Sequence, residues 1–183
     1  MEAIIQSFAL VFVSEMGDKT QLLALVLASR FKKPWTIMAG ILCATLLNHG
    51  IASYAGGWLG AHVDPVMLAR VLAGIFVVFA IWILIPDKDE DLKSEPRFGA
   101  FLTTLVAFFL AEMGDKTQLA TVALGARFNA PVIVTLGTTA GMMVADGLAV
   151  FLGERLTRVV PMKYIRWFAA ALFFAMGVYI LRG

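Results

Sequence analysis

Cysteine and histidine are scarce in this 183-residue chain, which has one cysteine, Cys43, and two histidines. A single cysteine excludes an intramolecular disulfide and a cysteine-rich metal site, and Cys43 in its apolar stretch is most simply a packing residue. The chain also lacks an H-E-x-x-H motif, a glycine-rich phosphate loop and a recognisable pair of nucleophile and base. The sequence therefore does not indicate an enzyme.

Charged residues are the next shortage, because they make up only 15% of the chain, whereas 60% of it is hydrophobic. The mean hydropathy is +0.84. Such values lie well outside those of a soluble domain of this size. We therefore predict an all-α membrane protein, and we attribute its small net charge of +2 to membrane topology and not to a nucleic-acid partner.

Six apolar stretches have about the length that a helix needs to cross a hydrocarbon core of about 30 Å. They cover residues 4–27, 35–54, 66–85, 99–124, 131–152 and 164–181. The start M-E-A-I-I-Q has no basic region, and acids interrupt the apolar run that follows it. We therefore expect no cleaved signal peptide and predict six transmembrane helices.

Lysine and arginine are unevenly distributed between the two sides of these predicted helices. The connections after the first, third and fifth stretches carry the basic residues Arg30, Lys32, Lys33, Lys88, Lys93, Arg97, Arg155, Arg158, Lys163 and Arg166. The opposite side has only Arg70, Arg127 and Arg182. Because basic loops stay in the cytoplasm, we predict that both termini lie on the non-cytoplasmic side.

The sequence E-M-G-D-K-T-Q-L occurs twice, at residues 15–22 and 112–119, an offset of 97. The same offset aligns Pro34 with Pro131 and Gly40 with Gly137, so a three-helix unit is duplicated. Because three is odd, the second copy enters the membrane from the opposite side. Inverted repeats of this kind are typical of secondary transporters with a substrate site near the midplane.

The domain organisation follows from this duplication. We predict a single transmembrane domain over residues 1–183. It consists of a first three-helix repeat at 1–85, a charged cytoplasmic linker at 86–97 with the sequence P-D-K-D-E-D-L-K-S-E-P-R, and a second three-helix repeat at 98–183.

Each motif lies near the middle of a predicted span, where a charged residue costs about 2.5–3.5 kcal/mol on insertion scales. Such groups must pair, face water or bind an ion. On a continuous helix at about 100° per residue, Glu15, Asp18 and Leu22 share one face. The small residues Gly17 and Gly114 allow close helix packing or local unwinding.

Two interpretations of the motif charges differ in what they leave unpaired. Pairing of Glu15 with Lys19, and the same pairing in the second motif, would only hold helices together and would leave Asp18 and Asp115 without partners. An ion site fits better, because each motif keeps one negative charge and two charges match one divalent cation. Carboxylate and amide oxygens suit Ca²⁺, Mg²⁺ and Mn²⁺, and disfavour zinc and copper. The candidate metal ligands are Glu15, Asp18, Gln21, Glu112, Asp115 and Gln118, where the two glutamines are ligands or hydrogen-bond partners of the acids.

Other polar residues surround this predicted site. His49 and Asp146 occupy equivalent positions in the two repeats and are candidates for a proton relay, unless both lie solvated or hydrogen-bonded near helix ends. The lysines either release the carboxylates when a cation arrives or only compensate their charge, and the threonines bond the backbone or a neighbouring helix. The proton-coupling or supporting candidates are Lys19, Thr20, Lys116, Thr117, His49 and Asp146.

Two copies of E-x-G-D-[KR]-[ST], at residues 15–20 and 112–117, resemble the Mn²⁺/Ca²⁺ cation-proton exchanger family. That family includes bacterial manganese exporters and the Golgi calcium/manganese exchangers of yeast and animals. Both copies match without departure, and the resemblance covers essentially the whole chain. It implies that Glu15, Asp18, Glu112 and Asp115 form the cation site, that Mn²⁺ and Ca²⁺ are the ions, and that a small bacterial member exports Mn²⁺.

We therefore expect a transporter in a bacterial inner (plasma) membrane that exports Mn²⁺, with Ca²⁺ as a second candidate ion, in exchange for protons. It would work by alternating access and would need no cofactor besides the transported cation. The transporter would be embedded in the lipid bilayer. The sequence leaves open whether it is a monomer or a homodimer. Two alternatives remain: an exporter of basic amino acids or other organic cations, and a structural membrane protein in which the motifs clamp helices.

Overall fold

The computed structural model describes residues 1–84, 99–152 and 162–182. All regular secondary structure in this part of the chain is α-helical. The helices are α1 (Glu2–Glu15), α2 (Lys19–Phe31), α3 (Pro34–His62), α4 (Pro65–Trp82), α5 (Ala100–Glu112), α6 (Lys116–Phe128), α7 (Pro131–Leu152) and α9 (Met162–Arg182). The predicted all-α class is confirmed, whereas the linker at 86–97 and most of the basic connection after α7 lie outside the described residues.

Helices α3, α4 and α7 are long and apolar enough to cross a membrane. α5 and the segment Trp167–Arg182 of α9 are shorter apolar helices. The first and fourth predicted spans are each divided into two helices, α1 with α2 and α5 with α6. The six-span inverted-repeat arrangement therefore stays a prediction.

The expectation of a continuous helix through each motif is wrong. α1 ends at Glu15 and α2 begins at Lys19, and the second motif is interrupted at the equivalent residues. Gly17 and Gly114 have φ angles of 80° and 79°, a backbone conformation that glycine adopts without the steric penalty of a Cβ atom. Because the chain turns here, Glu15 and Asp18 do not share one helix face.

The two repeats pack against each other through equivalent pairs of helices. α1 packs against α7, and its repeat equivalent α5 packs against α3, the equivalent of α7. Both contacts depend on a glycine: a Cβ atom at Gly137 would lie 2.7 Å from the Ile4 oxygen, and one at Gly40 would lie 2.9 Å from the Phe101 oxygen. These close approaches hold the ends of α1 and α5 at equivalent places in the fold.

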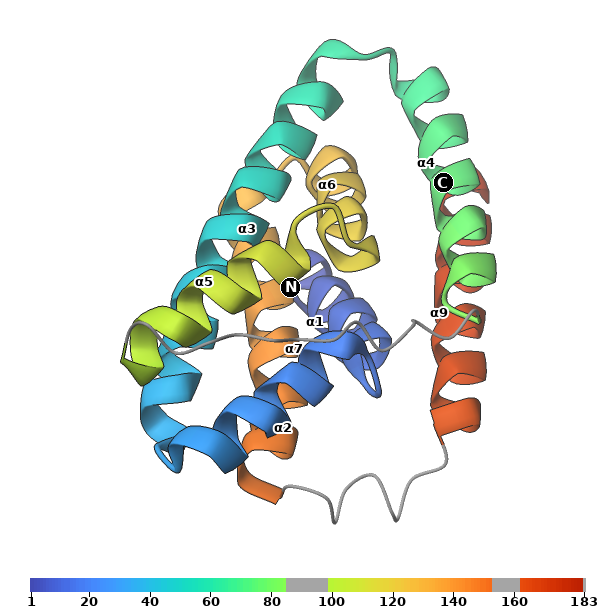
Figure 1. The fold of residues 1–183 in the computed structure, drawn as a ribbon. Helices are drawn as coiled ribbons and strands as arrows, with labels where there is room; N and C mark the ends of the chain where they lie inside the picture. The colour runs from blue at the N-terminus through green and yellow to red at the C-terminus, as the bar shows by residue number, and fades with distance from the viewer. Residues whose placement is uncertain (85–98, 153–161, 183) are drawn as a thin grey trace.

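α4 and α9 form a separate pair along one side of the molecule (Figure 1). Their contact is aromatic at its centre, where the ring centroids of Phe76 and Phe173 are 5.9 Å apart. One apolar core joins this pair to α6, and a second core lies among α1, α2, α3, α5 and α7. The two interrupted helices thus meet away from the α4–α9 contact, inside the larger group of helices.

Candidate cation site

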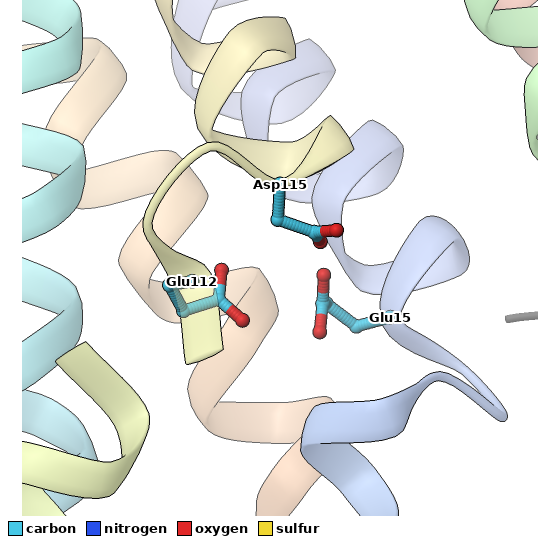
Figure 2. Close-up of side chains that lie close together, drawn as sticks. All are labelled: Glu15, Glu112 and Asp115. Atoms are coloured by element: carbon cyan, nitrogen blue, oxygen red, sulfur yellow. The ribbon is translucent and has the colours of Figure 1, made fainter. Parts of the chain in front are cut away.

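Three buried carboxylates meet where the two interrupted helices approach each other. Glu15, Glu112 and Asp115 each offer an oxygen, and these oxygens lie within 4.8 Å of one another. Figure 2 shows the side chains pointing toward a common centre, Glu15 from the end of α1, Glu112 from the end of α5 and Asp115 from the start of α6. The fold thus brings together acids from both copies of the motif.

A glutamine side chain stabilises each turn between the half-helices. Gln21 Oε1 accepts a hydrogen bond from the Gly17 N–H at 2.9 Å, and Gln118 Oε1 accepts one from the Gly114 N–H at 2.7 Å. The Gln21 amide nitrogen also donates to the Ala145 oxygen of α7 at 2.9 Å. These predicted ligands therefore already use their amide oxygens to hold the turns, and their place in the structure is that of positioning residues.

A threonine orients the glutamate within each motif. The Thr20 hydroxyl donates to Glu15 Oε2, and the Thr117 hydroxyl donates to Glu112 Oε2 at 2.9 Å. The sequence predicts that these hydroxyls bond the backbone or a neighbouring helix, and the structure gives each one the glutamate of its own motif, which ends the preceding helix. The other oxygens, Oε1 of both glutamates, are buried and have no hydrogen-bond partner among the described residues. They are the acceptors available to a ligand.

The lysines pair with the aspartates of the opposite repeat. Lys19 Nζ lies 3.2 Å from Asp115 Oδ1, and Lys116 Nζ lies 2.9 Å from Asp18 Oδ2. This arrangement differs from the i, i+4 pairing of Glu15 with Lys19, because the break in the chain places those two residues on different helices. The ion pairs therefore join the two halves of the chain at the site.

His49 and Asp146 are fully buried in the interiors of α3 and α7. Within the described part of the chain, neither ring nitrogen of His49 and neither carboxylate oxygen of Asp146 has a hydrogen-bond partner. Asp146 interacts electrostatically with Glu15 and Asp18. The alternative that both residues are solvated near helix ends is wrong, although neither belongs to the group of carboxylates within 4.8 Å of one another that the described residues form.

Asn48 and the backbone oxygen of Ala145 support the turns, although both lie outside the repeated motif. The Asn48 amide nitrogen donates to the Phe109 oxygen at 3.1 Å, and its oxygen lies 3.5 Å from the Gln118 nitrogen. The equivalent residue in the other repeat is Ala145, which acts through its backbone oxygen. The offset of 97 aligns these positions, but an asparagine aligned with an alanine gives no reason to assign either a role.

The chemistry of the group favours a hard cation. Glu15, Glu112 and Asp115, with Asp18 and Asp146 nearby, provide five carboxylates, whereas Lys19 and Lys116 provide two ammonium groups. Buried charges in excess of their partners are unfavourable unless a proton or a cation compensates them. Carboxylate oxygens are the ligands that Ca²⁺, Mg²⁺ and Mn²⁺ prefer, so the residues present fit such an ion as cargo.

Comparison with known families agrees with this chemistry. A family model described as "Divalent cation/proton antiporter GDT1" matches residues 3–91 and 100–183. This chain belongs to the GDT1 family. The match confirms the resemblance that the twin motifs indicate, and it gives the GDT1 protein the class of a transporter of divalent cations and protons.

Relatives of this GDT1 protein occur in bacteria and plants. A Vibrio cholerae serotype O1 protein named "Putative manganese exporter" is 42% identical over 179 residues, which cover 97% of this chain and 90% of that protein. GDT1-like protein 3 of Arabidopsis thaliana is 27% identical over 97% of this chain and 69% of its own length. A GDT1-like protein of Synechocystis is 26% identical over 97% of this chain and 96% of its own length. No solved structure matches the GDT1 chain.

Proposed function

We propose that this GDT1 protein exports Mn²⁺ from the cytoplasm in exchange for protons, with Ca²⁺ as a second transported ion. The observation that carries the proposal is the buried group formed by Glu15, Glu112 and Asp115, whose oxygens lie within 4.8 Å of one another. Each repeat contributes to this group, so a movement between the repeats changes the geometry of the site. That coupling is what alternating access around a midplane site requires.

Glu15 and Glu112 are the central cation ligands in this proposal. Each has one oxygen held by a threonine and one buried oxygen without a hydrogen-bond partner among the described residues. Asp115 and Asp18 complete the set when the cation displaces the lysine that pairs with each of them. Gln21 and Gln118 support this set by holding the turns.

Lys19 and Lys116 act as internal substitutes for the cation. In the structure, their ammonium groups compensate the two aspartates across the repeat boundary at 3.2 and 2.9 Å. A divalent cation competes for the same oxygens, so its arrival releases the lysines and its departure lets them return. The lysines thus lower the cost of burying the aspartate charges in an apolar environment when no cation is bound.

Protons take the place of the cation on the return step. A buried group of carboxylates must be compensated in both states, and protons bind the same oxygens as the metal. Two protons for each divalent cation keep the charge of the site unchanged. Asp146 and His49, buried and without hydrogen-bond partners among the described residues, are the proposed proton-coupling residues in α7 and α3.

The proposed setting is a bacterial inner membrane, crossed six times, with both termini on the non-cytoplasmic side. The matching contacts of α1 with α7 and of α5 with α3 support an arrangement of inverted repeats. The excess of basic residues after the first, third and fifth spans supports the orientation. The 42% identity to the Vibrio protein with its printed name supports Mn²⁺ as the cargo.

The test is cation flux into proteoliposomes under an imposed pH gradient, compared for Mn²⁺, Ca²⁺ and Mg²⁺. We expect saturable Mn²⁺ flux that follows the gradient and is lost in Glu15→Gln. The control is Asp64→Asn, which neutralises an exposed acid at the start of α4. Mn²⁺ flux that ignores the pH gradient would overturn proton exchange, and full flux in Glu15→Gln would overturn the proposed site.

The same assay separates the two alternatives. Inhibition by lysine or arginine with no response to any divalent cation would indicate an exporter of organic cations. If Glu15→Gln loses its fold and the wild-type protein transports no cation, the crossed ion pairs only clamp the helices. The clamp gives no role to the buried oxygens of Glu15, Glu112 and Asp146 that have no hydrogen-bond partner among the described residues, which is why we favour the exchanger.

A further inference from the structure

The α4–α9 pair is symmetric with respect to the duplication. The offset of 97 aligns α4 with α9 and relates, for example, Phe76 to Phe173 and Leu72 to Ala169. All four are buried in the same core, at 0%, 3%, 4% and 1% exposure. The pair therefore presents equivalent surfaces to the two halves of the protein.

This symmetric pair nevertheless packs unequally on the two equivalent helices α6 and α2. Its core includes Ala123 and Ala126 of α6, which are 2% and 4% exposed. The equivalent residues of α2 are Val26, which is 47% exposed, and Ser29, which is also exposed. The α4–α9 pair thus covers the second half of α6 and leaves the corresponding face of α2 open.

An arginine at the end of α6 fastens this contact. The Arg127 guanidinium lies 4.8 Å from the ring centroid of Tyr179 in α9 and also contacts the Met176 sulfur. Its Nη2 lies 3.8 Å from Glu2 Oε1 of α1, and the Tyr179 hydroxyl donates to the same oxygen at 3.3 Å. Arg127 therefore joins α6 to both α1 and α9 at one end of the molecule.

We call the contact of Arg127 with Glu2, Met176 and Tyr179 a clamp, and the first repeat has equivalent residues for most of it. The equivalents of Arg127, Tyr179 and Met176 are Arg30, Trp82 and Phe79. Arg30 is exposed at the end of α2. Trp is the best cation–π partner for an arginine, and the residue equivalent to Glu2 is Gly99. The two halves thus encode clamps of different composition.

The packing of α4 on α3 and α6 is incomplete. An apolar cavity of about 710 Å³ lies between α4, the second half of α3 and α6, lined by residues that include Leu59, Val71, Val78 and Val122. The cavity gives the α4–α9 pair room to shift against α6. In transporters built from inverted repeats, alternating access is largely a rocking or gating of one repeat or bundle against the other around a fixed site.

We infer that the α4–α9 pair is the moving element of the transporter, docked on α6 through Arg127 and Tyr179 in this structure and on α2 through Arg30 and Trp82 in the opposite state. The inference rests on the alternating access proposed above. In the proposed orientation the Arg127 end is the non-cytoplasmic end.

Distances between spin labels test this movement without relying on transport. Two equivalent cysteine pairs, Ala130→Cys with Val178→Cys and Lys33→Cys with Ile81→Cys, report on the two docking positions in a Cys43→Ser background. Changing from Mn²⁺ at high pH to metal-free protein at low pH should lengthen one distance and shorten the other. A pair inside the moving element, Val71→Cys with Phe168→Cys, should keep its distance.

The outcome is read together with Mn²⁺ flux by the same variants. Unchanged distances for both docking pairs in a variant that transports would overturn the inference and leave the exchanger intact. A change between Val71 and Phe168 in such a variant would also overturn it, because the pair would not move as a unit. Exchanged distances without flux of any divalent cation would support the movement and overturn the proposed cargo.

The two arginines give a matched test of the clamps. Arg127→Ala should increase the population with a short Lys33–Ile81 distance, whereas Arg30→Ala should decrease it. Opposite shifts are expected because each substitution weakens a different docked state. Shifts in the same direction, or none in either variant, would show that these arginines do not fasten the α4–α9 pair.

Discussion

The two copies of the motif have one sequence and one backbone conformation. In both, the helix stops at the glutamate, the glycine has a positive φ of about the same size, and the glutamine accepts a hydrogen bond from that glycine. In both, the threonine donates to the glutamate. The local structure of the site is therefore determined by the eight shared residues, independently of what surrounds them.

The surroundings of the two copies differ. The Lys19 side chain is 26% exposed, whereas that of Lys116 is 9% exposed. The glutamine nitrogens meet a backbone oxygen of α7 in the first copy and the Asn48 side chain in the second. Duplication thus supplies two equal halves of a site, and the residues that differ between the repeats make them unequal. The following substitutions probe where the copies remain equal and where they do not.

The largest effect is expected from Glu15→Gln and Glu112→Gln, tested one at a time. Each removes the charge of a central ligand, and we expect Mn²⁺ affinity to fall by at least about 100-fold, the upper end of what loss of a supporting group costs. Calorimetric titration of the purified protein measures the affinity. Equal losses would show that the two halves bind equally, whereas wild-type affinity in either variant would contradict its role as a ligand.

Replacing the two motif lysines one at a time should lower the stability of the protein by different amounts. Lys116→Ala leaves a buried partner, Asp18, without its 2.9 Å contact, and breaking a buried ion pair costs about 3–5 kcal/mol. We expect Lys19→Ala to be milder, because Lys19 is more exposed. Thermal unfolding in detergent measures both, and Lys116→Ala combined with Asp18→Asn should recover part of the loss. Equal or greater destabilisation by Lys19→Ala would show that the more buried lysine is not the more important one for stability.

Gln21→Ala should lower the unfolding temperature more than Gln118→Ala, by a smaller margin than the one between the lysine variants. Gln21→Ala leaves the Gly17 N–H and the Ala145 oxygen without their 2.9 Å bonds, and a buried unsatisfied group costs about 1–3 kcal/mol. The second bond of Gln118 is 3.5 Å long, so less is lost with it. A variant Gln118→Ala that unfolds before Gln21→Ala would show that the second turn depends on its glutamine more than these distances indicate.

The smallest effects are expected at the turn glycines, where the copies should remain equal. Gly17→Ala and Gly114→Ala place a Cβ atom on a left-handed backbone, which costs about 1–2 kcal/mol. Gly50→Ala is the control: like Gly114, Gly50 has no atom within 4 Å of an added Cβ, but it lies in α3, where alanine is favoured by about 0.5–1 kcal/mol. The same unfolding assay should show opposite signs, and a stabilised Gly114→Ala would contradict the account of the turn.

The duplication, the all-helical class and the motif residues that meet at the site were predictable from the sequence. The breaks in the first and fourth spans were anticipated only as one of two roles for the motif glycines, close packing or local unwinding, because hydropathy measures apolar content and does not detect a turn inside an apolar stretch. A signal was present in M-G-D-K, since glycine often follows the end of a helix and aspartate often begins the next. We interpreted the glycine as a possible point of unwinding within one helix.

The burial of His49 shows a second limit. The second span was predicted at residues 35–54, which places His49 near its end, but α3 continues to His62 and makes that position interior. The region from Ser53 to His62 contains glycines that reduce its apolar signal, and they are used for close packing against α6. The crossed lysine–aspartate pairs were likewise unpredictable, because the sequence gives the spacing within a motif but not the distance between two motifs.

The crossed pairs have a consequence for how the protein is made. When the first repeat leaves the ribosome, Lys19 and Asp18 enter the membrane without the residues that pair with them in the finished protein, Asp115 and Lys116. Those partners follow 97 residues later in the chain, after helices α2, α3, α4 and α5. Until the second half is made, these charges lack the partners that compensate them in the finished protein, so we expect the first half to need water or the insertion machinery near it.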